Sequence, residues 1–114
     1  MELKETIELM QSGDYRERFK AEYLQTKIRH EKLKLFNAKI EAARRTLCCD
    51  LSLDPLNNHV VKVEEPKHDC PRELLCDQQR VMGEYLHLLE VRAVIEGIDL
   101  VHIHETGECR AKTE

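Results

Sequence analysis

Apolar side chains recur at helical spacing in three segments of this chain. A short first helix within residues 1–12 is predicted by Leu3, Ile7 and Met10. The second segment, residues 15–46, contains neither Gly nor Pro, and one side of it carries Leu33, Phe36, Ile40, Ala43 and Leu47. At 1.5 Å per residue this helix is about 48 Å long, so it needs a partner running alongside.

The third segment predicts a second long helix over residues 71–97. Its apolar positions are Leu74, Leu75, Val81, Met82, Tyr85, Leu86, Leu88 and Leu89. Pro71 suits the first helical position, with Cys70 or Asp69 as the cap. Before the first long helix, Gly13 suits the positive φ that stops a helix, and Asp14 suits the next N-cap. Gly83 marks a close approach of two helices.

Together these segments predict a single all-α domain over residues 1–114, built as an antiparallel hairpin of two long helices. The connecting loop, residues 48–69, is rich in turn signals and long for a compact domain. The tail, residues 99–114, begins with an alternating stretch at 100–104. A minor β pairing between that stretch and residues 59–63 is a further expectation.

Composition favours a helical bundle over an enzyme with a deep pocket. Charged residues make up 35% of the 114, and there is no Trp. The N-terminus lacks the pattern of a signal peptide, and no apolar run approaches the length of a membrane span. We therefore expect a cytoplasmic protein whose five cysteines are reduced, since an odd count does not complete a disulfide framework.

Charge is divided unevenly along the chain. Residues 15–46 hold ten Lys/Arg against four Asp/Glu, about +6, whereas the other residues hold eight against eighteen, about −10. A basic helix in an acidic chain indicates either a surface for an anionic partner or pairing with its own acidic neighbours. A solvated basic face is the third interpretation. Nucleic acid is a disfavoured partner because the whole chain is acidic.

A candidate anion site lies near the open end of the predicted hairpin. Guanidinium and ammonium groups bind phosphate there, and a tyrosine ring stacks on a base. The candidate residues are Tyr15, Arg18, Tyr23, Lys27, Arg29 and Arg92. The alternative is an interhelical ion-pair network in which Arg92 and Glu96 form an i,i+4 pair and Arg18 lies near Glu96.

Metal binding and catalysis have little support in the residues. His68, Cys70, His102, His104 and Cys109 are metal-ligating types, but no pairing of a structural zinc site occurs. No phosphate-binding Gly-rich loop or nucleophile motif is present. We therefore expect no metal, no cofactor and no catalytic residue.

Self-association is expected because the end of the second long helix is apolar nearly all round. Val91, Val94, Ile95 and Ile98 widen its apolar side, which implies cover on two faces. Replacing Val91, Val94 or Ile98 by Asp is expected to reduce the oligomer or unfold the chain.

Residues 15–33 and 79–98 resemble a family of small phage and prophage helical-hairpin proteins, loosely related to a crAss-like phage protein. The resemblance extends over residues 13–47 and 70–100. It implies an accessory phage protein that counters host immunity, with no catalytic residues to transfer. Members of this kind either sequester nucleotide signals in homo-oligomers or bind a defence protein directly.

The favoured function is thus a non-enzymatic, homo-oligomeric protein in the host cytosol that sequesters an anionic nucleotide signal. One alternative is direct inhibition of a defence effector, in the manner of an anti-CRISPR protein. Another is a purely structural or assembly module without a ligand.

Overall fold

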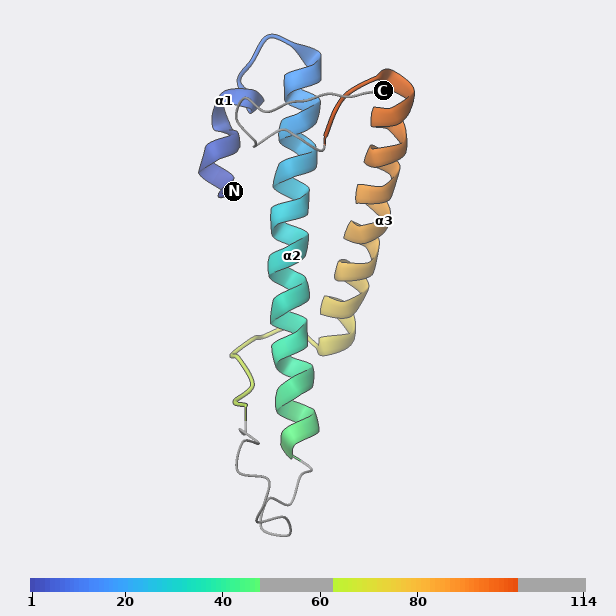
Figure 1. The fold of residues 1–114 in the computed structure, drawn as a ribbon. Helices are drawn as coiled ribbons and strands as arrows, with labels where there is room; N and C mark the ends of the chain where they lie inside the picture. Colours follow the sequence, from blue (N-terminus) through green and yellow to red (C-terminus); the bar gives the residue numbers. More distant parts are fainter. Residues whose placement is uncertain (48–62, 101–114) are drawn as a thin grey trace, which may run out of the picture.

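The computed structural model describes residues 1–47 and 63–100, and every regular element among them is helical. A 3₁₀ turn, η1 (Leu3–Thr6), runs into the one-turn helix α1 (Ile7–Met10). Two long helices follow, α2 (Tyr15–Leu47) and α3 (Arg72–Glu96), which lie side by side in opposite directions (Figure 1). The predicted all-α hairpin is confirmed. The β pairing of 59–63 with 100–104 lies almost wholly outside the described residues.

Local contacts explain where the two long helices begin and end. Asp14 caps α2 as predicted, because its carboxylate accepts a hydrogen bond from the backbone N–H of Arg16 at 3.0 Å. At the end of α3, Gly97 takes φ +72° and the N–H of Ile98 reaches back to the carbonyl of Ala93 at 2.8 Å. This is the hydrogen bond of a Schellman cap, which satisfies a terminal carbonyl.

Two predicted helix ends differ from the structure. Gly97, not Gly13, carries the positive φ, because the cap bond closes around α3 whereas α1 is too short to need one. Pro71 is the N-cap of α3 with an extended ψ of 145°, and neither Cys70 nor Asp69 fills that role. The Pro71 carbonyl accepts hydrogen bonds from Leu74 and Leu75, so α3 begins at Arg72, one residue later than predicted.

The face of α3 that meets α2 follows a seven-residue repeat. Its buried and half-buried members are Leu75, Gln79, Met82, Leu86, Leu89, Ala93 and Glu96. This spacing of alternating three and four residues is that of helices packed at a shallow angle. Gly83 lies at the contact, where an added Cβ would come within 3.3 Å of the His30 ring. The predicted close approach is therefore present.

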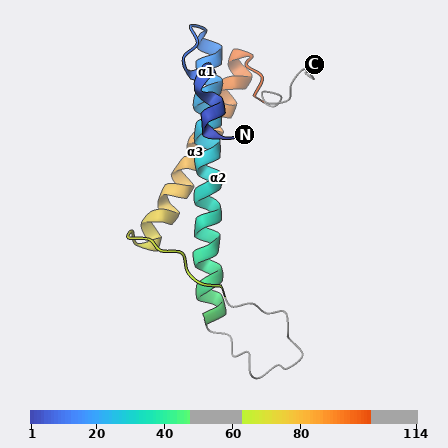
Figure 2. The same ribbon diagram turned by 90° about the vertical axis from the view of Figure 1, so that its left-hand side faces the viewer.

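The main core lies at the open end of the hairpin. Phe19, Tyr23 and Leu24 of α2 pack with Leu86, Leu89 and Ala93 of α3 and with Ile98 beyond it. The first segment covers the other side of α2, where Leu9 contacts this core and Gln25 donates to the buried Thr6 hydroxyl at 2.8 Å (Figures 1 and 2).

The apolar stripe predicted on α2 is only partly buried. Ile40 and Ala43 are buried, but Leu47 is 66% exposed. The reason is that α2 extends past the start of α3, so α3 does not cover its last turns (Figure 1). Residues 63–70 run back along this part of α2, where the N–H of Val63 lies 3.4 Å from the Thr46 hydroxyl (Figure 2).

Candidate functional site

Polar side chains line one edge of the α2–α3 contact at the open end. Tyr15 of α2 donates to the Glu96 carboxylate at 2.9 Å and accepts from the Arg92 guanidinium at 2.6 Å. Arg92 also forms an ion pair with Glu96 at 3.1 Å and lies over the ring of Phe19, 5.0 Å from its centre. The predicted i,i+4 pair is present, and Tyr15 ties it to α2.

This network holds its charges by internal contacts. Hydrogen bonding from Tyr15, together with Arg92, lowers the pKa of the Glu96 carboxyl, while the same hydrogen bond raises the pKa of Tyr15. Tyr15 is therefore a neutral donor at neutral pH, engaged by a carboxylate. Arg92 is half-exposed but already opposed by Glu96, which reduces its attraction for an outside anion.

The other candidate residues lie apart from this network. The Arg18 guanidinium donates to the Ser12 carbonyl at 2.9 Å, so it secures the turn before α2. Arg29 is exposed, two turns beyond Glu22, which accepts a hydrogen bond from Tyr85 of α3. Tyr23 and Lys27 lie on the opposite edge of the contact. The six predicted residues thus do not gather at one site: Tyr15 and Arg92 lie at one edge of the contact, and Tyr23 and Lys27 lie at the other.

The opposite edge contains a cleft of about 560 Å³ between α2 and the end of α3. Its wall is mostly apolar, formed by Leu24, Ala93, Val94, Ile98 and Leu100. Polar groups come from Tyr23, Lys27, Glu90 and Asp99. A largely apolar concavity of this size with few polar groups is typical of a small-molecule site.

Tyr23 is a wall of this cleft and not a free stacking platform. Tyr23 is 7% exposed, and its hydroxyl donates to the Glu90 carboxylate at 2.8 Å. Burial, together with that hydrogen bond, raises the pKa of Tyr23 to about 12, so the phenol stays protonated. The sequence expectation of a base stacked on this ring therefore does not fit its buried position, which only the partner helix determines.

A row of lysines follows the α2 side of the cleft. Lys20 and Lys34 lie seven residues before and after Lys27, about 10.5 Å to either side along the helix. Among the described residues, no carboxylate forms an ion pair with any of the six Lys/Arg between Lys20 and Lys39. The central part of α2 thus keeps its positive charge on the surface, and α3 does not neutralise it.

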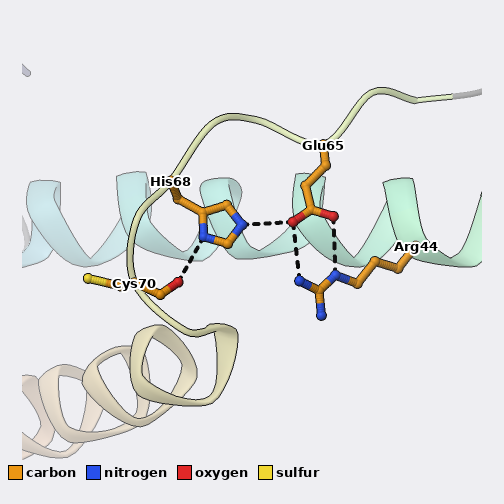
Figure 3. A network of polar contacts seen from close by, with 4 residues as sticks. All are labelled: Arg44, Glu65, His68 and Cys70. Carbon is orange, nitrogen blue, oxygen red and sulfur yellow. Dashed lines mark hydrogen bonds and ion pairs between the residues drawn. The ribbon is translucent and has the colours of Figure 1, made fainter.

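A second polar cluster joins the 63–70 segment to α2 (Figure 3). The Glu65 carboxylate forms two hydrogen bonds with the Arg44 guanidinium, each 3.2 Å, and one with His68 at 2.7 Å. The other ring nitrogen of His68 lies 2.8 Å from the Cys70 carbonyl, and the ring packs edge-on against Phe36. Both ring nitrogens face acceptors, an arrangement that only the protonated imidazole satisfies fully.

We expect Glu65→Gln to bring the pKa of His68 down toward its ordinary value of 6.5. Hydrogen bonding to Glu65, then to the Cys70 carbonyl, raises this pKa, while Arg44 and then His68 lower the pKa of Glu65 to about 2. The His68 contribution to stability is complete below pH 6.5 and is lost as pH rises through its raised pKa. The Glu65 contribution is complete above pH 4.5 and is lost as pH falls toward about 2.

Proton NMR of the His68 ring across this pH range measures the effect directly. An identical His68 titration in wild type and variant would contradict the assignment of this contact.

Within residues 1–47 and 63–100, no three His, Cys, Asp or Glu side chains gather closely enough to hold a metal ion. His68 and Cys70 belong to this part, whereas His102, His104 and Cys109 lie outside it. The two cysteines that the structure describes, Cys70 and Cys76, are not joined to each other. A search of the described helices for a segment long and apolar enough to cross a membrane finds none.

Comparison with known protein families finds a match to part of the chain. The model of the Sequestin family matches residues 53–95 of this chain. The matched range includes Glu65, His68 and all of α3 except Glu96, but none of α2. No curated protein and no solved structure matches the chain.

Proposed function

We propose that this chain is a non-enzymatic binding protein that sequesters a small anionic nucleotide. The cleft between α2 and α3 carries the proposal, because it combines an apolar wall with an exposed lysine at its rim. The Sequestin name denotes sequestration, and the matched range supplies Glu90, Ala93 and Val94 to this cleft.

The chemistry of the cleft suits a nucleobase with more than one phosphate nearby. The base packs against Val94 and Ile98 inside the apolar wall. Phosphates lie along the lysine row, where Lys27 and Lys20 are about 10.5 Å apart. Glu90 can accept a hydrogen bond from an exocyclic amine of the base, as carboxylates do with cytosine. Of the six candidate residues, Tyr23 and Lys27 then form the site.

Sequestration requires binding without turnover, and the cleft favours this outcome. Among the described residues that line it, the titratable groups are a tyrosine that stays protonated, one lysine and two carboxylates, and none of these residues is a histidine or a cysteine. Lowering the free concentration of a nucleotide immune signal in a host cell is the biological role that we propose, in keeping with a phage origin.

We expect Lys27→Ala to weaken nucleotide binding about ten- to a hundredfold, since a charge-assisted contact contributes roughly 1.5–3 kcal/mol. Calorimetry with a panel of cyclic mononucleotides, cyclic dinucleotides and ADP measures the affinity in wild type and variant. Lys39→Ala is the matched control, because it removes an exposed charge from α2 away from the cleft. Equal losses in both variants would indicate a general charge effect and exclude the cleft.

A thermal melt and a recovery assay complete the test. A nucleotide that binds the folded chain raises its melting temperature, and heat denaturation should release that nucleotide unchanged. Inorganic pyrophosphate, which lacks the base, should bind more weakly. No saturable binding across the panel would refute sequestration and favour the direct inhibition of a defence protein.

A further inference from the structure

An apolar stripe on α3, with the charged residues Asp77, Glu84 and Arg92 between its members, is left uncovered by the hairpin. Four large side chains lie on it at strict seven-residue spacing: Leu74, Val81, Leu88 and Ile95, with exposed fractions of 55%, 51%, 59% and 77%. A set of exposed apolar residues that runs the length of a helix marks an interaction surface, whereas single exposed residues do not.

The stripe repeats the spacing of the face that already packs on α2. Each of its residues comes directly before a residue of that buried face, so the two faces lie about 100° apart around α3. A helix with two adjacent apolar faces is typical of a bundle with more than two long helices. The first segment does not supply the missing cover, because it lies on the far side of α2 (Figure 1).

We propose that the stripe binds the same stripe of a second copy of this chain, in antiparallel orientation about a two-fold axis. Such an interface is self-complementary, so one surface completes both copies. Charge favours this orientation: Arg92, which forms an ion pair with Glu96, flanks the stripe near its C-terminal end, and Asp77, which forms an ion pair with Arg80, flanks it near the N-terminal end. Antiparallel packing brings these opposite charges together, whereas parallel packing would place Arg92 against its own copy.

The polar groups beside the stripe are compatible with being covered. The Tyr85 hydroxyl is hydrogen-bonded to Glu22, and Arg92 is bound by Tyr15 and Glu96. Arg80 forms ion pairs with Asp77 at 3.7 Å and with Glu84 at 3.3 Å, so the charges between the stripe residues also have partners within α3 when the contact covers them. Of the three positions that the sequence suggested for self-association, Ile98 is 6% exposed and belongs to the core, whereas Val91 and Val94 are 43% and 82% exposed. Val91 lies beside the stripe, and Val94 lines the cleft.

The dimer surface and the nucleotide cleft lie on opposite edges of the α2–α3 contact. Glu90 and Val94, which line the cleft, occupy the side of α3 away from Leu88. Both clefts of a dimer thus stay open, giving two sites per particle. Loss of the dimer and loss of nucleotide binding are consequently separate outcomes.

Light scattering after size-exclusion chromatography tests the proposal with two matched variants. Wild type should have twice the 13.4 kDa mass of one chain at tens of micromolar. Leu88→Glu should have the mass of one chain, with its helical circular dichroism retained because this side chain is exposed in the hairpin. Leu35→Glu is the control, since Leu35 is 58% exposed on the side of α2 away from α3; it should remain dimeric. Val81→Glu provides a second stripe variant should Leu88→Glu unfold.

Orientation is tested by a charge pair at the two ends of the stripe. Leu74→Glu alone should weaken the dimer, and adding Ile95→Lys should restore it, because antiparallel packing sets the new carboxylate beside the new ammonium of the partner. A double variant weaker than either single variant would overturn the antiparallel arrangement. A monomeric wild type would overturn the proposed dimer, and it is also the result expected if a host protein occupies the stripe instead. A dimeric Leu88→Glu would show that the dimer forms through another surface.

Discussion

Phe19→Ala is expected to destabilise the hairpin by about 3–5 kcal/mol, the range found for removal of a large buried aromatic ring. Phe19 is 4% exposed and lies at the centre of the main core. Its ring contacts Tyr15 edge-on, with centres 6.1 Å apart, and it supports the Arg92 guanidinium at 5.0 Å. Alanine removes the apolar volume and the support of this network together.

Phe19→Leu separates these two contributions. Leucine keeps most of the apolar volume, so we expect a loss of about 1–1.5 kcal/mol, of which the cation–π contact accounts for roughly 0.5–1. Urea denaturation followed by circular dichroism, at one protein concentration for all variants, gives both values. Equal losses for leucine and alanine would mean that the aromatic contacts, and not burial, give Phe19 its importance.

Leu89→Ala is expected to lower the free energy of unfolding by about 2–5 kcal/mol. Leu89 of α3 is 2% exposed and belongs to the main core that α3 forms with α2. Leu35→Ala makes the same chemical change at a position that is 58% exposed. Since alanine suits a helix as well as leucine does, this control should stay within about 0.5 kcal/mol of wild type. Urea titrations of the two variants measure the difference, and similar losses would contradict the assigned faces of the helices.

Sequence periodicity was sufficient for the main elements of the fold. The Gly- and Pro-free run after Asp14 and the Gly97 stop determine most of both long helices, because capping and backbone restrictions act locally. The N-cap role of Pro71 was missed, because proline suits both the N-cap and the first helical position. Which of the two it takes depends on the path of the preceding loop, which the sequence pattern does not predict. Burial of Leu47 was overestimated because the length of α2 relative to α3 depends on where the loop returns.

The candidate site was harder to predict than the fold. Tyr15 and Tyr23 lie eight residues apart on one helix, and the edge of the contact that each occupies depends on the position of α3. The cluster of Arg44, Glu65 and His68 joins a helix to an irregular segment, so no periodic signal reveals it. Periodicity predicts which face is buried; it does not predict which polar side chains find partners across the contact.

Asn37 shows how this hairpin selects one alignment. It is buried in the α2–α3 contact, where its amide nitrogen donates to the Gln79 side chain at 2.8 Å and to the Leu75 carbonyl at 3.2 Å. Its side-chain oxygen has no hydrogen-bond partner among the residues that the structure describes. A slip of α3 by seven residues would match apolar side chains again but would set Asn37 against Leu86 instead of Gln79. Misaligned hairpins therefore lose the amide pairing and gain little, as with a buried asparagine in a coiled coil. Asn37 contributes less to the stability of the hairpin than a leucine would. It instead disfavours slipped alignments of α3, which are therefore short-lived during folding.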